Sequence, residues 1–253
     1  MLVAARPRAL VSAAFILARC AARAATTVAL RPGEAASEDE KTILFVRHAE
    51  GWHNKHAREL PNWHADALGL TEAYRDARLT PVGEGQARAL NAELAANATF
   101  APPDVVVVST LTRTIQTAAL AFEGFDVPFV STELCRERIA DHECDHRRTR
   151  AALEADFGSF VDFSDVDDDD DALWTSRKEV EPDEMAATLC SERAADFLAW
   201  LADRPEPRVA VVSHWVFLKH LFALYPAFPE LAENFRNAEL RVAAISARRN
   251  DEL

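Results

Sequence analysis

Two histidines and two arginines of this 253-residue chain follow apolar runs, at or shortly after the point where each run ends. They are Arg47 and His48 after residues 42–46, Arg113 after residues 105–108, and His214 after residues 209–212. Two guanidinium groups and a protonated imidazole can hold the nonbridging oxygens of a phosphoryl group. A second, neutral imidazole can attack the phosphorus atom as a nucleophile. The set therefore predicts a phosphoryl-transfer site in which arginines, rather than a metal ion, supply positive charge.

The apolar runs themselves predict the scaffold for these residues. All three are short and rich in β-branched side chains, which is typical of parallel strands covered on both faces. Weaker strand candidates lie at residues 128–130 and 240–245. In such sheets a ligand binds beyond the carboxyl ends of the strands. We therefore expect the four side chains to meet at one edge of one sheet.

Helical patterns separate these strands, at residues 81–98, 112–122 and 183–201. Thr80 is a favourable N-cap for the first helix, and Pro81 suits its first position. The third helix carries one apolar stripe, made of Cys190, Ala194, Phe197, Leu198 and Leu201. The alternation predicts an α/β fold: a three-layer sandwich with a mainly parallel central sheet flanked by helices.

Several motifs, in order along the chain, resemble those of the histidine phosphatase (phosphoglycerate mutase-like) superfamily. Residues 45–54 are similar to its R-H-G-E-x-x-x-N signature, and residues 76–87 to its D-x-x-L-T-x-x-G-x-x-Q-A segment. Residues 109–118 resemble S-x-x-x-R-x-x-Q-T-A, and residues 211–214 carry the second histidine. Loops within residues 135–145, 162–164 and 234–239 are most similar to those of plant and fungal phosphoglycerate mutase-like proteins.

The resemblance implies a role for each matching residue. His48 would accept the phosphoryl group, and Glu137 would donate a proton to the leaving oxygen. The phosphate pocket would be completed by His214, the second catalytic histidine, and by three phosphate ligands, Arg47, Asn54 and Arg113. Two positions depart from the family pattern. Ala49 replaces a glycine, and Trp215 replaces a small residue where an indole would reshape the substrate pocket.

The resemblance covers residues 41–246, in which residues 135–182 would form an inserted cap, followed by a tail at 247–253. Arg147 and Arg148, together with Arg150, form a basic patch near Glu137 that could hold a second anionic group of the substrate. The alternative is the start of a surface helix. The acidic run Asp165–Asp171 lacks the glycine and glutamate of a calcium loop, so we predict a solvated insertion.

No metal site or other cofactor is predicted. Cys135, His142, Cys144 and His146 are zinc-capable, but their spacing fits no C-x₂₋₄-C pair. Cys135 and Cys144 could instead form a disulfide across a short loop in an oxidising compartment. Cys190 is expected to be a small buried hydrophobe.

The net charge is −13, and residues 1–33 hold five arginines and no acid. An acidic body argues against binding of nucleic acid, and we expect no membrane association after processing. Residues 1–33 resemble a cleaved targeting segment, with an apolar core at residues 9–18. The C-terminal sequence Asn-Asp-Glu-Leu is one residue from an ER retrieval signal. We expect the ER lumen or secretory pathway, with a mitochondrion or plastid as the alternative.

These features favour a metal-independent phosphoric monoester hydrolase that acts on a small phosphorylated substrate through a phosphohistidine. Phosphoglycerate mutase-type transfer is the first alternative. A binding protein that keeps the fold without catalysis is the second.

Overall fold

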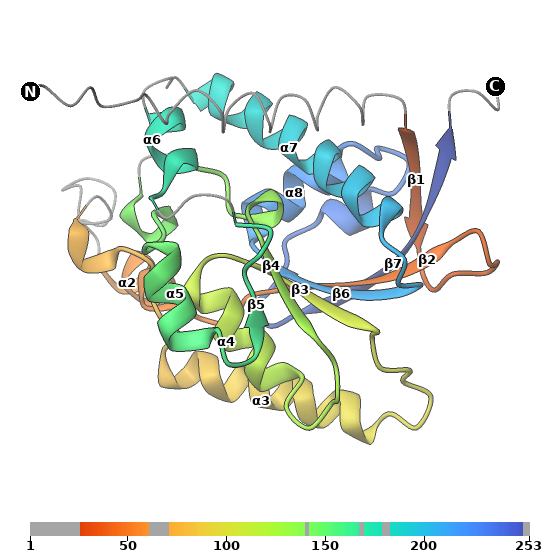
Figure 1. The fold of residues 1–253 in the computed structure, drawn as a ribbon, viewed down its shortest axis with the longest axis horizontal. Coiled ribbons are helices and arrows are strands. Elements are labelled where there is room, and N and C mark those ends of the chain that lie inside the picture. The colour runs from red at the N-terminus through yellow and green to blue at the C-terminus, as the bar shows by residue number, and fades with distance from the viewer. Residues whose placement is uncertain (1–25, 61–70, 140–141, 167–169, 179–182, 250–253) are drawn as a thin grey trace, which may run out of the picture.

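The computed structural model describes residues 26–60, 71–139, 142–166, 170–178 and 183–249. Its centre is a seven-stranded sheet in the order β1-β7-β2-β6-β3-β4-β5 (Figure 1). The strands are β1 Thr26–Pro32, β2 Lys41–Arg47, β3 Val105–Ser109, β4 Phe129–Thr132, β5 Val161–Asp162, β6 Arg208–Ser213 and β7 Leu240–Arg249. β2, β6, β3, β4 and β5 are parallel, whereas β7 is antiparallel to both of its neighbours.

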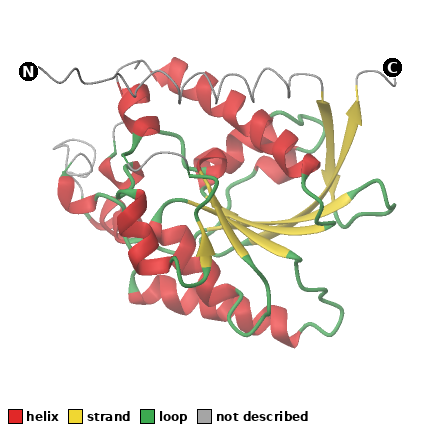
Figure 2. Cartoon of the chain, viewed as in Figure 1, coloured by secondary structure: helices red, strands yellow, loops and turns green. Residues whose placement is uncertain are grey.

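Helices cover both faces of the sheet (Figure 2). The α-helices are α2 Trp52–Glu59, α3 Pro81–Ala96, α4 Thr112–Ala121, α5 Arg150–Phe157, α6 Ala172–Lys178, α7 Asp183–Asp203 and α8 Trp215–Ala223. Short 3₁₀ turns are η2 Glu72–Tyr74, η3 Glu133–Cys135, η4 Glu143–Asp145 and η5 Pro229–Ala232. The predicted three-layer α/β sandwich is confirmed.

Alternate side chains of each central strand enter opposite cores, as the pleat of a strand requires. In β2, Ile43 and Phe45 pack with residues of α7 and α8, while Leu44 and Val46 pack with residues of α3 and α4. All four are fully buried. A strand that is apolar at every position therefore has to lie between two helical layers.

The register of the central strands aligns their carboxyl ends. Arg47 at the end of β2 is opposite Ser213 at the end of β6, and Val212 of β6 is opposite Val108 of β3. The segments that follow these three strands therefore begin at one edge of the sheet. They contain His48, Arg113 and His214.

The predicted helices and strands are present, with ends shifted by a few residues. Thr80 Oγ1 accepts a hydrogen bond from Gly83 N at 3.0 Å and caps α3, as expected. The apolar stripe predicted for the third helix is buried against the sheet. Helices α2, α5, α6 and α8 were not predicted. In the described residues, no helix is long and apolar enough to cross a membrane.

The last part of the expected targeting segment, residues 26–32, lies in the sheet. Thr26–Pro32 form β1, which pairs along its whole length with β7, and Leu30 is buried in the core. Tyr225 also donates a hydrogen bond to the Val28 carbonyl at 2.8 Å. A targeting segment that ended before Thr26 would leave β1 intact. Residues 1–25 and the tail tetrapeptide lie outside the described residues.

The predicted cap, residues 135–182, is joined to the sheet. It contains η4, α5 and α6, but also β5, which is parallel to β4 and extends the sheet at that edge. Leu153, Val161 and Phe163 of this segment enter the core beneath α3 and α4. Residues 140–141, 167–169 and 179–182 of the insertion lie outside the described residues.

Replacement of Leu30 by alanine tests whether β1 belongs to the folded domain. We expect a loss of about 2–4 kcal/mol in the free energy of unfolding, because a buried leucine leaves a cavity. Ala29→Ser, on the exposed side of the same strand, should change it by less than about 0.5 kcal/mol. Urea denaturation of the purified protein measures both. Equal stability of Leu30→Ala and wild type would show that β1 is dispensable.

Candidate active site

His48 follows β2 and is only 2 % exposed. Its Nδ1 lies 2.7 Å from the Ala49 carbonyl oxygen, which can only accept, so Nδ1 carries the hydrogen. Burial lowers the pKa of His48 well below its usual range, and the charges of Arg113 and Arg47 lower it further. The ring is therefore neutral with a lone pair on Nε2, which is the form that a nucleophile needs.

The loop before β7 holds the end of β2 in place. Asn237 Nδ2 donates to the His48 carbonyl at 3.0 Å, and Arg47 Nη1 donates to the Phe235 carbonyl at 2.6 Å. Ala238 N bonds the Arg47 carbonyl at 3.1 Å, with Ala238 at a positive φ of 55°. This loop is one of those that the resemblance singled out, and its hydrogen bonds fix the backbone at Arg47 and His48.

Arg113 projects from the first turn of α4 and is 1 % exposed. Its Nη2 donates to Asp145 Oδ1 at 2.7 Å, and its Nη1 donates to the Cys144 carbonyl at 2.5 Å. Its Nε is buried and has no hydrogen-bond partner among the described residues. Arg47 Nε is likewise buried without a hydrogen-bond partner among the described residues.

His214 lies between β6 and α8 and is the N-cap residue of α8. Its ring centroid lies 5.1 Å from that of His48. Its Nε2 contacts Ser109 Oγ at 2.8 Å, while its buried Nδ1 has no partner among the described residues. Burial, followed by the charge of Arg113, lowers the pKa of His214 well below its usual range. In this environment the ring is neutral and offers a single N–H, rather than the two of a protonated imidazole.

Glu137 lies after η3 and contacts the N-terminus of α8. Its Oε1 accepts from Phe217 N and Arg138 N, both at 2.8 Å, and its Oε2 accepts from Val216 N at 3.3 Å. Burial raises the pKa of Glu137, and the negative charge of Asp145 raises it further, against the opposing pull of these backbone groups and Arg113. A carboxyl group with a raised pKa is suited to donate a proton.

Other motif residues position the loop after β2. Glu50 Oε1 accepts from Thr80 Oγ1 at 2.8 Å, and Ala49 N donates to Thr117 Oγ1 at 2.9 Å. A Cβ on Gly83 would lie 2.1 Å from the Glu50 carbonyl oxygen, so only glycine allows α3 to approach this closely. Asn54 Oδ1 accepts from Gly51 N at 3.0 Å and caps α2, which leaves its Nδ2 without a partner among the described residues.

Comparison with known proteins agrees with this geometry. The model of the histidine phosphatase superfamily (branch 1) matches residues 43–251. The chain belongs to this superfamily. It is 32 % identical over 244 residues to an Arabidopsis thaliana "Phosphoglycerate mutase-like protein", which covers 83 % of this chain and 86 % of that one. Arabidopsis "Phosphoglycerate mutase-like protein 1" is 33 % identical over 239 residues, with 81 % of each chain covered.

A solved structure, Bacillus stearothermophilus YhfR, shares the fold with a TM-score of 0.50 and 22 % identity, over 79 % of this chain and 89 % of that one. The family and the fold together identify an enzyme of the histidine phosphatase or phosphoglycerate mutase type.

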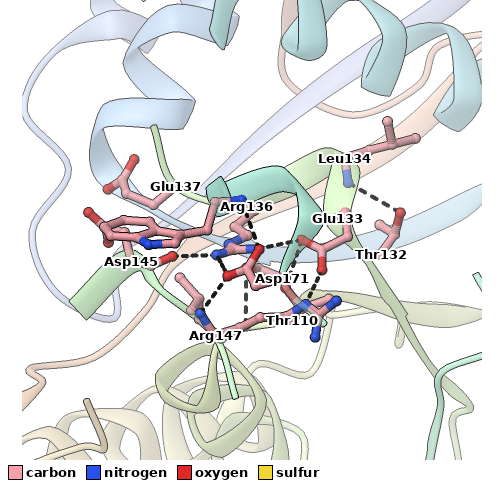
Figure 3. Close-up of polar contacts among 12 residues, drawn as sticks. Thr110, Thr132, Glu133, Leu134, Arg136, Glu137, Asp145, Arg147 and Asp171 are labelled. Atoms are coloured by element: carbon pink, nitrogen blue, oxygen red, sulfur yellow. Dashed lines mark hydrogen bonds and ion pairs between the residues drawn. The ribbon is translucent and has the colours of Figure 1, made fainter. Parts of the chain in front are cut away.

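A buried ionic network (Figure 3) connects the insertion to the candidate active site. The fully buried Arg136 donates from Nη1 to Asp171 Oδ1 at 2.8 Å and from Nη2 to Asp171 Oδ2 at 2.5 Å. Arg136 Nη2 also bonds the Asp145 carbonyl at 2.5 Å. Because Asp145 is the partner of Arg113, a continuous chain of polar contacts runs from Asp171 through Arg136 and Asp145 to Arg113.

Arg147 and Arg148 do not form the substrate patch that we expected. Arg147 is buried, with Nε on Glu133 Oε1 at 2.5 Å and Nη2 on the Asp170 carbonyl at 2.9 Å. Arg148 is engaged by Asp76 Oδ2 at 3.0 Å and Asp156 Oδ2 at 2.9 Å. Both guanidinium groups are bound to carboxylates of the chain, so they act in holding the insertion.

The acidic run is likewise not wholly solvated. Asp165 and Asp170 are exposed, but Asp171 is buried at 5 % exposure and accepts further bonds from Arg147 N and Trp174 N, both at 2.9 Å. Residues 167–169 lie outside the described residues. Sequence spacing could not single out Asp171, because its partner Arg136 lies 35 positions away.

The cysteines behave as buried side chains. Cys135 and Cys144 are free thiols, so the disulfide that we considered is not formed. Burial raises the pKa of both. His146 stacks on Trp174 and contacts Glu143 at 2.9 Å. Among the described residues, no group of three or more metal-binding side chains could hold an ion.

Three residues near the site were not predicted: His53, Glu133 and Asp145. Asp145 and Glu133 lie in or beside segments that the resemblance covers, but only the fold shows which arginines they meet. Trp215, the unusual residue after His214, begins α8 and is partly buried. Its Nε1 is buried without a partner among the described residues, and Lys219 Nζ lies 5.7 Å from its ring.

Replacement of Asp171 by asparagine tests the network. Burial acts to raise the pKa of Asp171, but the hydrogen bonds and charge of Arg136 lower it below its ordinary value. We expect a loss of about 3 kcal/mol near pH 7, because the buried Arg136 loses its main counter-ion. The difference should shrink as the pH falls below about 4, where Asp171 of the unfolded chain becomes protonated, and disappear below the lowered pKa of folded Asp171.

Urea denaturation between pH 3 and pH 7 measures this dependence. Asp165→Asn, in the exposed part of the same run, is the matched control and should change stability by less than about 0.5 kcal/mol. A similar small effect of Asp171→Asn would contradict the assigned role of the ion pair.

Proposed function

We propose that this protein is a metal-independent phosphomonoesterase that forms a phosphohistidine at His48. The observation that carries the proposal is the set of buried nitrogens around a neutral imidazole. Arg47 Nε, Arg113 Nε and His214 Nδ1 have no hydrogen-bond partner within the described residues. Buried donors normally have partners, so the site calls for an external group rich in acceptor oxygens. A phosphoryl group supplies three such oxygens and the negative charge that two arginines favour.

The mechanism uses each group in the state derived above. His48 Nε2 attacks the phosphorus atom in line, and the bond from phosphorus to the leaving oxygen breaks. The protonated carboxyl of Glu137 gives its proton to that oxygen. Water then attacks the phosphorus of phospho-His48, and its proton passes to the Glu137 carboxylate. Inorganic phosphate leaves, with His48 neutral and Glu137 protonated as at the start.

Hydrolysis is favoured over mutase-type transfer by the residue that follows His214. A mutase must hold the dephosphorylated intermediate and return the phosphoryl group to it. Trp215 brings an indole to a position where the family has a small residue, and Arg147 and Arg148 are bound to carboxylates rather than available for a second anionic group. A silent binding protein is disfavoured because the nucleophile, the arginines and Glu137 are all in place.

Phosphate release from a panel of phosphomonoesters, measured with EDTA present, tests the proposal. Wild type should turn over and give an acid-labile, base-stable phosphoenzyme. His48→Ala should lose at least about 10³-fold in turnover and form no phosphoenzyme, because the covalent route is removed. The thermal midpoint of the variant reports that it remains folded. Conversion of 3-phosphoglycerate without phosphate release would instead establish a mutase. Activity that needs a divalent ion would contradict the arginine-based mechanism.

Glu137→Gln tests the proton donor. Because the raised pKa of Glu137 keeps its proton on, kcat/KM of wild type should fall as the pH rises through that value. On the acidic side, neutral His48 keeps activity below its ordinary pKa of about 6.5. The variant should lose about 10²- to 10⁴-fold with alkyl phosphates and show no such alkaline decline.

The leaving group supplies the control for this variant. p-Nitrophenolate departs without protonation, so p-nitrophenyl phosphate should be affected at least tenfold less than an alkyl phosphate. An equal loss with both substrates would show that Glu137 does not donate the proton.

A further inference from the structure

The proposed mechanism gives no task to His53, the second residue of α2. This side chain is 8 % exposed, and its ring centroid lies 5.6 Å from that of His48. His48 is thus flanked by two imidazoles, His53 and His214, the latter at 5.1 Å. A buried histidine in a phosphoryl-transfer site requires a structural or a chemical reason.

A structural reason would be a hydrogen bond from the ring to the fold. Other histidines of this chain have one: His56 Nδ1 lies 2.7 Å from Tyr74 Oη, and His220 Nδ1 lies 3.1 Å from Ser191 Oγ. His53 Nδ1, by contrast, is buried without a hydrogen-bond partner among the described residues. No hydrogen bond to Nδ1 from the described fold explains why this buried ring is a histidine.

The backbone nevertheless fixes the ring. Gly51 is the N-cap residue of α2, and its N–H donates to Asn54 Oδ1 at 3.0 Å. A Cβ on Gly51 would lie 2.8 Å from both Nδ1 and Cε1 of His53, so this edge of the ring rests directly on the glycine. With the Nδ1 edge held there, Nε2 is the nitrogen left to meet a ligand.

The charge around His53 also points to an anion. Burial lowers the pKa of His53 well below its usual range, and Arg113, Arg47 and His142 lower it further. The ring is therefore neutral and carries one N–H, in the field of the same two arginines that face His48. An N–H group in a cationic, buried setting is satisfied by an anionic oxygen.

We propose that His53 is a further phosphoryl ligand, which donates a hydrogen bond from Nε2 to a nonbridging oxygen of the group being transferred. The inference rests on the function proposed above and adds one residue to its site. During transfer, charge is spread over the nonbridging oxygens, so a fixed donor stabilises the transition state more than the ground state. Loss of this donor should therefore lower kcat more than it raises KM.

Two substitutions at His53 separate donor from packing. His53→Phe keeps the ring and removes its nitrogens, whereas His53→Gln loses the ring but can bring an N–H close to the position of Nε2. We expect kcat to fall about 10²-fold in His53→Phe and to recover at least tenfold of that loss in His53→Gln. His56→Phe is the matched control, because His56 lies three residues further along α2 and contacts Tyr74. Its kcat should stay within about twofold of wild type.

Calorimetric titration with inorganic phosphate gives a readout that does not depend on turnover. Binding should weaken about tenfold in His53→Phe and less in His53→Gln, with thermal midpoints close to that of wild type. Full activity and unchanged phosphate binding in His53→Phe would overturn the inference while leaving the phosphatase proposal intact. A greater loss in His53→Gln than in His53→Phe would also overturn it, since packing would then explain the residue. A wild type that neither turns over phosphoesters nor binds phosphate would remove both proposals.

Discussion

A guanidinium group is costly to remove from water unless anions or carbonyl oxygens receive its hydrogens, and this chain buries Arg113, Arg136 and Arg147 almost completely. The arrangement around the active site follows from that constraint. Arg136 and Arg147 are surrounded by Glu133, Asp171 and nearby carbonyl groups. Arg113 has one carboxylate and one carbonyl, and its Nε is left over. Arg136 Nε is also without a partner among the described residues, so Arg136 and Arg113 differ in the number of carboxylates that they meet.

The same buried charge sets the states of the titratable groups. Exclusion of water and nearby positive charge keep His48, His53 and His214 neutral, so the positive charge of the site comes from the arginines. Glu137 is displaced in the opposite sense, toward its protonated form, by burial and by Asp145. Asp145 therefore contributes twice, as a partner of Arg113 and as a negative neighbour of Glu137. One local environment thus shifts His48 toward its neutral form and Glu137 toward its protonated form.

The sequence predicted the parts of this structure that local patterns determine. Runs such as residues 209–212 have to be buried on both faces, and a residue after such a run has to emerge at the carboxyl edge, so the positions of His48, Arg113 and His214 followed directly. The capped start of α3 followed from Thr80 and Pro81. What failed depends on distant partners. The neighbours of Arg147 in the sequence favour a position at the surface. Arg147 is buried because Glu133 and Asp171, which are distant in sequence, contact its side chain and its backbone N–H respectively. β1 was missed because its pairing partner lies at the other end of the domain.

The placement of β6 between β2 and β3 has a consequence for biosynthesis. His214 meets Ser109 across 105 positions of chain, and Asn237 reaches the His48 carbonyl across 189. A ribosome-bound chain that has released its first two hundred residues holds the nucleophile but neither of these contacts. Such high contact order makes closure of the sheet a late and comparatively slow event. Until then Phe45 of β2 and Val107 of β3 lack β6, the strand that pairs with both. The nascent chain therefore exposes unpaired strand edges, which favour aggregation, until its last part has folded.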